Sequence, residues 1–212
     1  MAKNPWQYYL IALIIVLIDQ SSKLWVHFNM SMGCAGAIQL IGTWLKLHYT
    51  LNPGMAFGIQ FGFKYGKLLL TLGRIVATCV IGWYIRQLVR EISTSTLLLW
   101  GWALILGGAV GNVIDSTFYA VLLDNAPHDA PMSWFYGQVI DMVYVDIWES
   151  KLPAWLPLIG NSYLSLFPIF NIADAAIFLG VVAVLWDRRR KQRAPISSPT
   201  TSPAIPLHAQ DQ

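Results

Sequence analysis

Four long runs of apolar residues, separated by more polar segments, dominate the pattern along this chain. They cover about residues 8–25, 68–85, 97–114 and 169–187. A helix needs about 20 predominantly apolar residues to cross the hydrocarbon core of a bilayer. The pattern therefore predicts an all-α membrane bundle with four transmembrane helices, in which the fourth run is the shortest.

The segment between the first two runs, about residues 27–65, is too polar to cross a membrane. Within it, residues 38–41 and 44–50 alternate in polarity as β-strands do. The sequence Asn52-Pro53-Gly54 then favours a turn. We therefore expect a small external β-cradle that lies on the membrane surface.

The remaining polar segments complete the domain organisation. Residues 116–166 are predicted to form an external loop, with an amphipathic, interfacial piece at 148–155. From Ala194 onward, Pro, Ser, Thr and Ala dominate and the apolar pattern ends, which is typical of disorder. We expect residues 1–193 to form a single integral membrane domain and residues 194–212 a disordered cytoplasmic tail.

Composition and charge support a membrane protein and orient it. The chain is 56% hydrophobic and only 12% charged, which lies outside the usual range of soluble domains. Basic residues beside membrane spans tend to stay in the cytoplasm. One side of the four runs carries eight of the 14 basic residues, namely Lys3, Arg86, Arg90, Arg188, Arg189, Arg190, Lys191 and Arg193. Both termini are therefore predicted to be cytoplasmic and both long polar segments external.

Several polar residues lie in apolar surroundings. Asp19 and Lys23 are four residues apart near the end of the first run, so on a helix they share a face and are expected to form an ion pair. Asn112 and Asp115 lie one turn apart at the end of the third run, after glycines that favour close helix packing. Arg74, inside the second run, is expected to extend to the outer surface, with binding of a lipid phosphate as the alternative.

Two aspartates carry the strongest chemical signal. Asp174 stands at the start of the fourth apolar run, and Asp141 lies in a β-branched stretch that can return to the same membrane face. An isolated carboxylate is costly in such surroundings. Two neighbouring carboxylates hold one proton between them and titrate as a unit. Such a pair can activate water for attack on a carbonyl group, so the sequence predicts an aspartic hydrolase.

Other mechanisms fit the sequence less well. A small transporter or proton-relay protein would use Asp19, Asp115 and Asp174 across the membrane depth, whereas these acids gather at one face. Ser22 and Lys23 are adjacent, so on a helix they point in different directions, which disfavours a Ser–Lys protease. The histidines show no metal-ligand spacing and no nucleophile-elbow motif is present. We therefore expect no metal and no cofactor.

Five short motifs, in this order, resemble those of lipoprotein signal peptidase, also called signal peptidase II. The resemblance covers roughly residues 8–187. The motifs are Asp19-x-x-x-Lys23, Asn52-x-Gly54-x-Ala56-Phe57, Gly107-Gly108-x-x-Gly111-Asn112-x-x-Asp115, Val139-Ile140-Asp141 and Phe170-Asn171-x-Ala173-Asp174.

This resemblance implies a specific activity. A member of the family is an aspartic endopeptidase of the bacterial inner membrane, with its active site at the outer, periplasmic face. It removes signal peptides from diacylglyceryl-modified prolipoproteins by cutting before the lipidated cysteine. The resemblance assigns the catalytic pair to Asp141 and Asp174. The residues that it implies for substrate binding or active-site support are Asp19, Lys23, Asn52, Gly54, Asn112, Asp115 and Asn171.

The resemblance also implies partners. We expect lipid-modified prolipoproteins as substrates, contact with membrane lipids, a monomeric state and no nucleic acid. Inhibitors of the globomycin type are expected to bind.

One position departs from the family pattern. The family commonly has arginine after the equivalent of Asp115, and this chain has Ser116. The role of that arginine must then be lost or supplied by another residue such as Arg74, which is included in the active-site support. The segment before Asp141 is also longer than in the family, and Asp146 follows only five residues later. The context Gly137-x-Val139-Ile140 favours Asp141.

Overall fold

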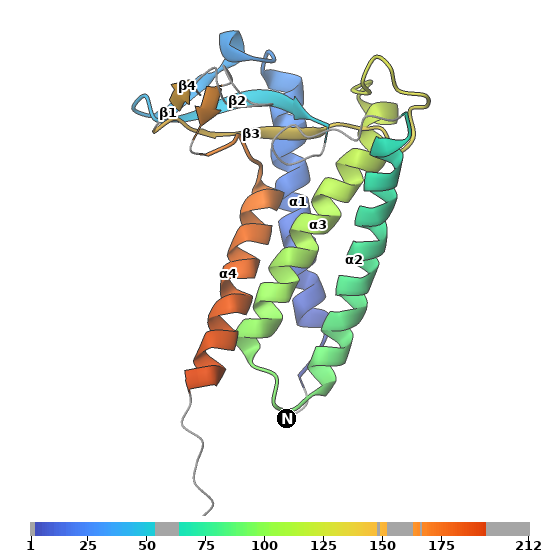
Figure 1. The fold of residues 1–212 in the computed structure, drawn as a ribbon, viewed down its shortest axis with the longest axis vertical. Helices are drawn as coiled ribbons and strands as arrows, with labels where there is room; N and C mark the ends of the chain where they lie inside the picture. Colours follow the sequence, from blue (N-terminus) through green and yellow to red (C-terminus); the bar gives the residue numbers. More distant parts are fainter. Residues whose placement is uncertain (1–2, 54–63, 148, 152–162, 166, 194–212) are drawn as a thin grey trace, which may run out of the picture.

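Four long helices form the body of the computed structural model, which describes residues 3–53, 64–147, 149–151, 163–165 and 167–193. The helices run side by side along the longest axis of the molecule (Figure 1). They are α1 (Trp6–Asn29), α2 (Gly66–Arg90), α3 (Thr96–Leu122) and α4 (Ile172–Arg193). The predicted bundle is therefore confirmed.

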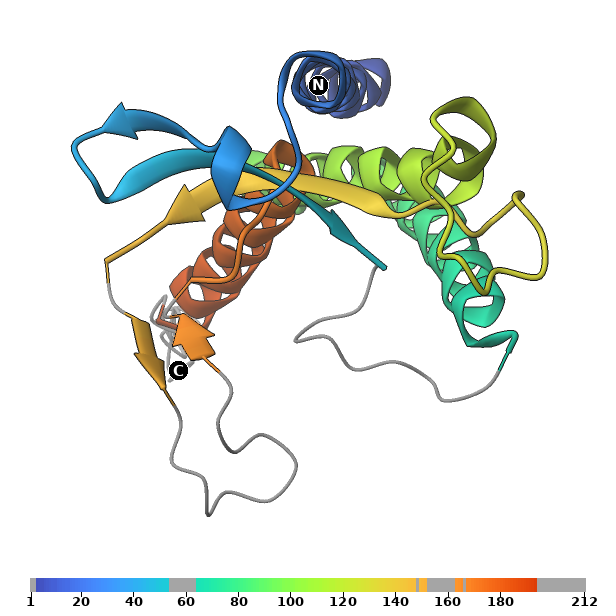
Figure 2. The same ribbon diagram turned by 90° about the horizontal axis from the view of Figure 1, so that it is seen from above.

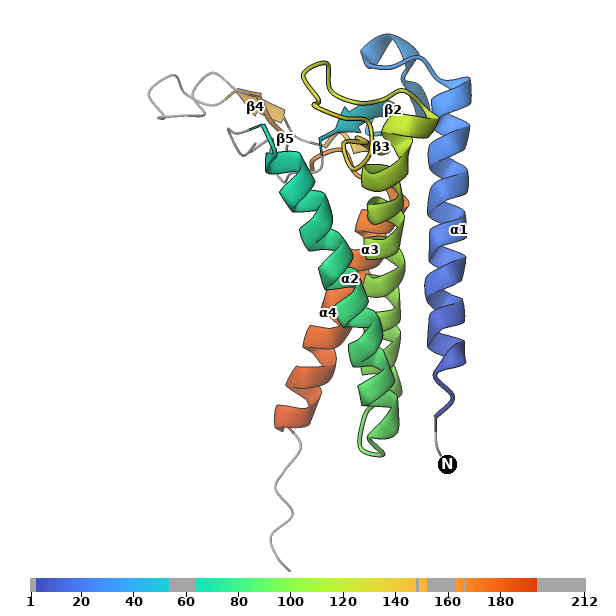
Figure 3. The same ribbon diagram turned by 90° about the vertical axis from the view of Figure 1, so that its right-hand side faces the viewer.

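The helices differ in how well they suit a membrane. By length and composition, α1, α2 and α3 are each long and apolar enough to cross a bilayer. The apolar part of α4 is shorter, because Asp174 lies in its first turn and a basic cluster begins at Arg188. The start of α1, the connection between α2 and α3, and the end of α4 all lie at the same end of the bundle (Figures 1 and 3).

A three-stranded antiparallel sheet lies across the opposite end of the bundle (Figure 2). Its strands are β1 (Ile38–Ile41), β2 (Leu45–Asn52) and β3 (Val139–Val145), with β2 in the centre. The first two strands occur where polarity alternates in the sequence. The third comes from the segment predicted as loop, and it pairs along β2 so that Asp141 lies opposite Thr50 and Val139 opposite Asn52.

The prediction that α3 ends at residue 114 is wrong, because the helix continues to Leu122. The extra turns are stable because they are covered. Ser116 and Tyr119 are buried, and the returning chain donates a backbone hydrogen bond from Gly137 to the Ser116 carbonyl at 3.0 Å. The segment predicted as an external loop therefore begins after α3, later than residue 116.

The fourth helix also begins later than predicted, at Ile172 rather than residue 169. Phe170, just before it, forms an isolated antiparallel bridge with Val143 of β3. Its backbone N–H donates to the Val143 carbonyl at 3.1 Å. This bridge holds the residue before α4 on the sheet. The helix begins two residues later, at Ile172.

Close contact between α3 and α4 depends on glycine. A Cβ atom added at Gly108 would lie 2.2 Å from the Ala173 carbonyl oxygen, and one at Gly180 would lie 2.5 Å from the Gly101 oxygen. Small residues at these points let the two helix backbones touch. The contact brings the first turn of α4 beside the middle of α3, where Asn112 lies.

Parts of the predicted external region fall outside the description. Gly54 and most of the predicted interfacial segment 148–155 lie outside the described residues, as does the predicted tail 194–212. The described part of that segment is β4 (Glu149–Lys151), which pairs antiparallel with the later strand β5 (Tyr163–Ser165).

Candidate active site

Asp141 and Asp174 meet at the sheet end of the bundle through one shared partner, Asn171. Asp141 comes from β3, Asp174 from the first turn of α4, and Asn171 immediately precedes that helix. The Asn171 side-chain amide donates to Asp141 Oδ1 at 2.6 Å, and its Oδ1 accepts from the Asp174 backbone N–H at 2.9 Å. Asn171 is fully buried. Its two hydrogen bonds therefore hold the Asp141 carboxylate of β3 close to the first turn of α4, which carries Asp174.

Two further asparagines each serve one carboxylate. Asn52 Nδ2 of β2 donates to Asp141 Oδ2 at 3.0 Å. Asn112 Nδ2 of α3 donates to Asp174 Oδ1 at 2.8 Å. The site therefore joins residues from two strands, from α3 and from the entrance of α4. The three asparagines singled out in the sequence all lie in it.

Asp141 has an unusual proton affinity. Burial raises its pKa to about 7, and the negative charge of Asp174 contributes to the rise. The hydrogen bonds from Asn52 and Asn171 favour the ionised form and oppose the change. The net result is a carboxyl group that holds a proton close to neutral pH.

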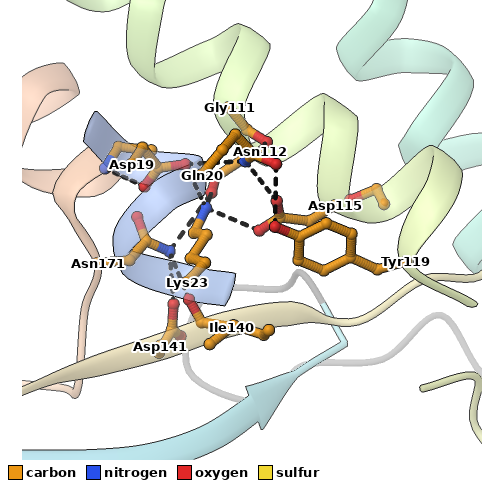
Figure 4. A network of polar contacts seen from close by, with 12 residues as sticks. Asp19, Gln20, Lys23, Gly111, Asn112, Asp115, Tyr119, Ile140, Asp141 and Asn171 are labelled. Carbon is orange, nitrogen blue, oxygen red and sulfur yellow. Dashed lines mark hydrogen bonds and ion pairs between the residues drawn. The ribbon is translucent and has the colours of Figure 1, made fainter. Parts of the chain in front are cut away.

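Lys23 lies in a fully buried ion cluster beside Asn171 and Asp141 (Figure 4). Its Nζ is 2.7 Å from Asp19 Oδ2 and 2.7 Å from Asp115 Oδ2, and it donates to Asn112 Oδ1 at 3.0 Å. The predicted ion pair with Asp19 is confirmed, and Asp115 is a second partner. Three acceptors use all three donors of the ammonium group.

This cluster determines how Asn112 is oriented. Because Lys23 occupies the Asn112 carbonyl oxygen, the amide nitrogen faces Asp174, where it can only donate. Lys23 therefore acts on the site through Asn112.

Asp19 positions the other side of the site. Its Oδ1 accepts the backbone N–H of Ala173 at 2.9 Å, so a residue of α1 satisfies one of the free N–H groups at the start of α4. A carboxylate at this end of a helix is also favoured by the helix dipole. Gly111 leaves room for it, since an added Cβ there would lie 2.6 Å from Asp19 Oδ2.

Arg74 turns inward rather than outward. Its Nη1 donates to Ser116 Oγ at 3.1 Å, and its charge interacts with those of Asp174, Asp115 and Asp141. The expectation that Arg74 extends to the outer surface is therefore wrong. The reason is tertiary, because Ser116 is buried in a turn of α3 that the sequence alone assigned to a loop.

Comparison with known proteins identifies the family. Residues 11–189 match the family model described as signal peptidase (SPase) II. The chain is 57% identical over 196 residues to the lipoprotein signal peptidase of Amoebophilus asiaticus, covering 92% of this chain and 83% of the relative. It is 36% identical to that of Porphyromonas gingivalis, covering 82% of this chain and 80% of the relative. The chain belongs to the signal peptidase II family.

Solved structures agree with this assignment at the level of the fold. One bacterial membrane enzyme superimposes with a TM-score of 0.61 at 21% identity, covering 91% of this chain and 93% of that one. A second gives a TM-score of 0.56 at 24% identity, covering 86% and 92%. Family membership and the apolar helices together make this chain a protein of the bacterial inner membrane.

Sequence reasoning missed two members of the site of this peptidase, Gln20 and Tyr119. Gln20 Nε2 donates to Asp115 Oδ1 at 2.8 Å and to Asp19 Oδ2 at 3.1 Å. Tyr119 Oη donates to Gln20 Oε1 at 2.9 Å. Tyr119 follows Asp115 by one helical turn, so the spacing contained the signal, but only for a helix that continues past residue 114.

Asp146, the neighbouring alternative to Asp141, lies elsewhere. Its Oδ2 is 2.6 Å from Lys46 Nζ in a partly exposed ion pair. The structure thus brings Asp141 rather than Asp146 to Asp174. Ser22 donates to the Asp19 carbonyl at 2.7 Å, while Lys23 is engaged by the acids, so the two do not form a Ser–Lys pair.

Proposed function

We propose that this chain is an aspartic endopeptidase that removes signal peptides from diacylglyceryl-modified prolipoproteins, cutting before the lipidated cysteine. The observation that carries the proposal is the Asn171 bridge, which joins Asp141 to Asp174 in a site where other buried charges are already paired. The relatives that are named lipoprotein signal peptidases support the substrate class.

The mechanism follows from how the pair holds its proton. Burial raises the pKa of Asp141 to about 7, so in the proposed mechanism Asp141 begins with the shared proton and Asp174 acts as the base. Asp174 takes a proton from water as the water oxygen bonds to the scissile carbonyl carbon. Asp141 donates its proton to the developing oxyanion. The C–N bond then breaks as Asp174 gives the nitrogen the proton that it received, and one hydroxyl of the intermediate returns its proton to Asp141 as the carbonyl re-forms.

The supporting residues act by orientation and charge. Asn52, Asn112 and Asn171 hold the two carboxylates, and the buried cluster of Asp19, Lys23 and Asp115 holds Asn112 and the start of α4. Arg74, anchored on Ser116, places a guanidinium near the dyad and takes over the part of the arginine that this chain lacks after Asp115. Gly54 keeps its assignment as a substrate-side residue from the family motif.

The alternative of a transporter or proton relay is not favoured. Asp19 and Asp115 are both paired with the same lysine and belong to the same polar cluster as the dyad. A relay would need acids distributed along the membrane depth. The family assignment also argues against it.

The proposed orientation places the sheet and the dyad at the periplasmic face and both termini in the cytoplasm. A diacylglyceryl chain can then stay in the outer leaflet while the peptide reaches the two aspartates. We propose that the enzyme acts as a monomer among membrane lipids and that globomycin-type inhibitors occupy this site.

A cleavage assay with a lipidated precursor peptide in detergent or liposomes tests the proposal. Asp141→Asn and Asp174→Asn should each lower cleavage by several orders of magnitude, and the double variant should be little worse, because residues that act as a unit are not additive. Asp146→Asn is the matched control and should keep most activity. An inactive Asp146→Asn beside an active Asp141→Asn would place the dyad on another residue.

A further inference from the structure

The end of the bundle opposite the dyad contains a separate cavity of about 330 Å³. It lies between the segment that enters α1 and the last turn of α2. Its lining residues are Lys3, Pro5, Arg86, Val89, Arg90, Glu91 and Ile92. None of them belongs to the active site, and the peptidase chemistry gives the cavity no role.

The cavity concentrates positive charge. Arg86 and Arg90 lie one turn apart on α2, and Lys3 joins them from the N-terminal segment. The Lys3 ammonium donates to the Thr94 carbonyl, which draws this segment against the connection between α2 and α3. Glu91 is the one acid in the lining, and its carboxylate accepts from the Thr94 hydroxyl at 3.5 Å.

Among the described residues, no acid forms an ion pair with these three cations. In the part of the chain that the structure describes, the ion pairs involve Lys23, Lys46 and Lys191, and none involves Lys3, Arg86 or Arg90. The C-terminal end of α2 contributes about half a negative charge. Together with Glu91, that still leaves a positive surplus in a concave site, which an anion would stabilise.

Aromatic residues place this cavity at the level of lipid headgroups. Trp6 is 75% exposed and Trp83, one turn before Arg86, is 61% exposed. Tryptophans gather at membrane–water interfaces. Tyr9 Oη donates to the Gly82 carbonyl at 2.9 Å, so α1 and α2 are joined at this level. The lining residues Val89 and Ile92 give the cavity an apolar side.

We infer that this cavity binds the phosphate of an anionic glycerophospholipid, whose acyl chains lie along the outer surface of α1 and α2. Arginine suits phosphate because its planar fork donates two parallel hydrogen bonds. Basic pockets between helices on the cytoplasmic side are suited to such headgroups. The bound lipid would bridge Lys3 of the N-terminal segment to the end of α2 and thereby stabilise the packing of α1 against α2.

The test measures lipid binding to the full chain and needs no peptide cleavage, so it is independent of the proposed activity. The probe is dioleoyl phosphatidylglycerol added to protein in a non-ionic detergent, followed by native mass spectrometry and thermal unfolding. Arg86→Gln with Arg90→Gln removes two lining charges. Arg188→Gln with Arg189→Gln removes the same charge from the same end of the bundle but outside the cavity.

We expect phosphatidylglycerol to raise the unfolding temperature of the wild type, and phosphatidylcholine to have little effect. Each cation near a headgroup contributes about fivefold in affinity, so the Arg86/Arg90 variant should bind about 25-fold more weakly. The Arg188/Arg189 variant should bind as the wild type does. Lys3→Gln, which precedes α1 and leaves the helices intact, should lose about fivefold.

Three results would overturn the inference. Equal losses in the two double variants would mean general attraction to the basic end of the bundle rather than a site. Full binding by both Lys3→Gln and the Arg86/Arg90 variant would mean that the lipid does not bind in this cavity. Stabilisation by inorganic phosphate equal to that by phosphatidylglycerol would indicate a free-anion site that does not select lipid.

Discussion

Two lysine–aspartate pairs in this molecule have nearly the same geometry and different surroundings. Lys23 lies 2.7 Å from Asp19 and the exposed fraction of both side chains is 0%. Lys46 lies 2.6 Å from Asp146, with 23% and 31% of the side chains exposed. The buried lysine has a second carboxylate and an asparagine as partners, whereas the surface pair joins the start of β2 to the residue that follows β3. Burial, rather than distance, decides how much each pair matters.

The physical reason is desolvation. A charge taken out of water is stable only while its partners remain, so removing one partner of a buried pair leaves an uncompensated charge. An exposed pair exchanges contact with water for contact with its partner at little net gain. In this chain the difference also has a functional side, because the buried lysine orients Asn112 and the surface lysine orients nothing in the site.

The largest effect is expected for Lys23→Met. It leaves Asp19 and Asp115 facing each other without a cation, which should lower the free energy of unfolding by about 3–5 kcal/mol. Unfolding in mixed detergent micelles, followed by circular dichroism, measures the loss. Lys46→Met is the matched control, and a loss of the same size in both variants would contradict the comparison.

Removing all three buried charges separates stability from positioning. The triple variant Lys23→Met, Asp19→Asn, Asp115→Asn should recover about 1–4 kcal/mol relative to Lys23→Met alone, because no buried charge is left unpaired. Cleavage should stay low, since nothing then holds the Asn112 carbonyl away from Asp174. If activity returned together with stability, Lys23 would be structural only.

Asp141 extends the comparison to a buried carboxyl group without a paired cation. Among the described residues it forms no ion pair, and the side-chain amides of Asn52 and Asn171 donate hydrogen bonds to it. Its pKa is raised from the ordinary 3.8 to about 7, so the folded state binds the proton more tightly than the unfolded state. Its contribution to stability is therefore present below about pH 4 and is lost as the pH rises through 7, at up to about 1.4 kcal/mol per pH unit. Cleavage should fall as the pH rises through about 7, because Asp141 then loses the proton that it donates.

Asp141→Asn tests the pH dependence directly. Unfolding measured from pH 4 to pH 8 should lose most of the slope in this variant, while Asp146→Asn should keep the slope of the wild type. A wild type whose stability does not change between these limits would show that Asp141 titrates at an ordinary pKa.

The smallest effect is expected at the surface pair. Lys46→Met should lower the free energy of unfolding by about 0.2–1 kcal/mol, and 1 M salt should reduce the difference further because the pair is screened. Cleavage should remain close to that of the wild type. A strong effect on cleavage without an effect on stability would show that this end of the sheet contacts the substrate.

Local sequence patterns were enough to predict a large part of this structure. The four apolar runs predicted the helices because bilayer thickness requires a length of apolar sequence that few other structures use. Alternation predicted β1 and β2, since side chains of a strand point to opposite faces in turn. Asp141 and Asp174 could be singled out because a carboxylate beside apolar sequence is costly unless it is used or paired.

Other features depended on contacts between distant residues. No local pattern predicts that α3 extends to Leu122, because those turns are stable only under the chain that returns at Gly137. The same extension buried Ser116, which turned Arg74 inward, and placed Tyr119 against Gln20. The third strand exists because β2 supplies a partner about 90 positions away, from Asn52 to Val139.

The sequence by itself determined which residues carry charge into the membrane and which segments cross it, because hydrophobicity and helix length act locally. Only the tertiary structure decided which charges meet. Asp19 can face Lys23 through helix spacing alone, but its hydrogen bond to Ala173 requires α1 and α4 to pack at one depth against α3. That packing depends on the glycine contacts between α3 and α4, and it converts separate polar residues into one site.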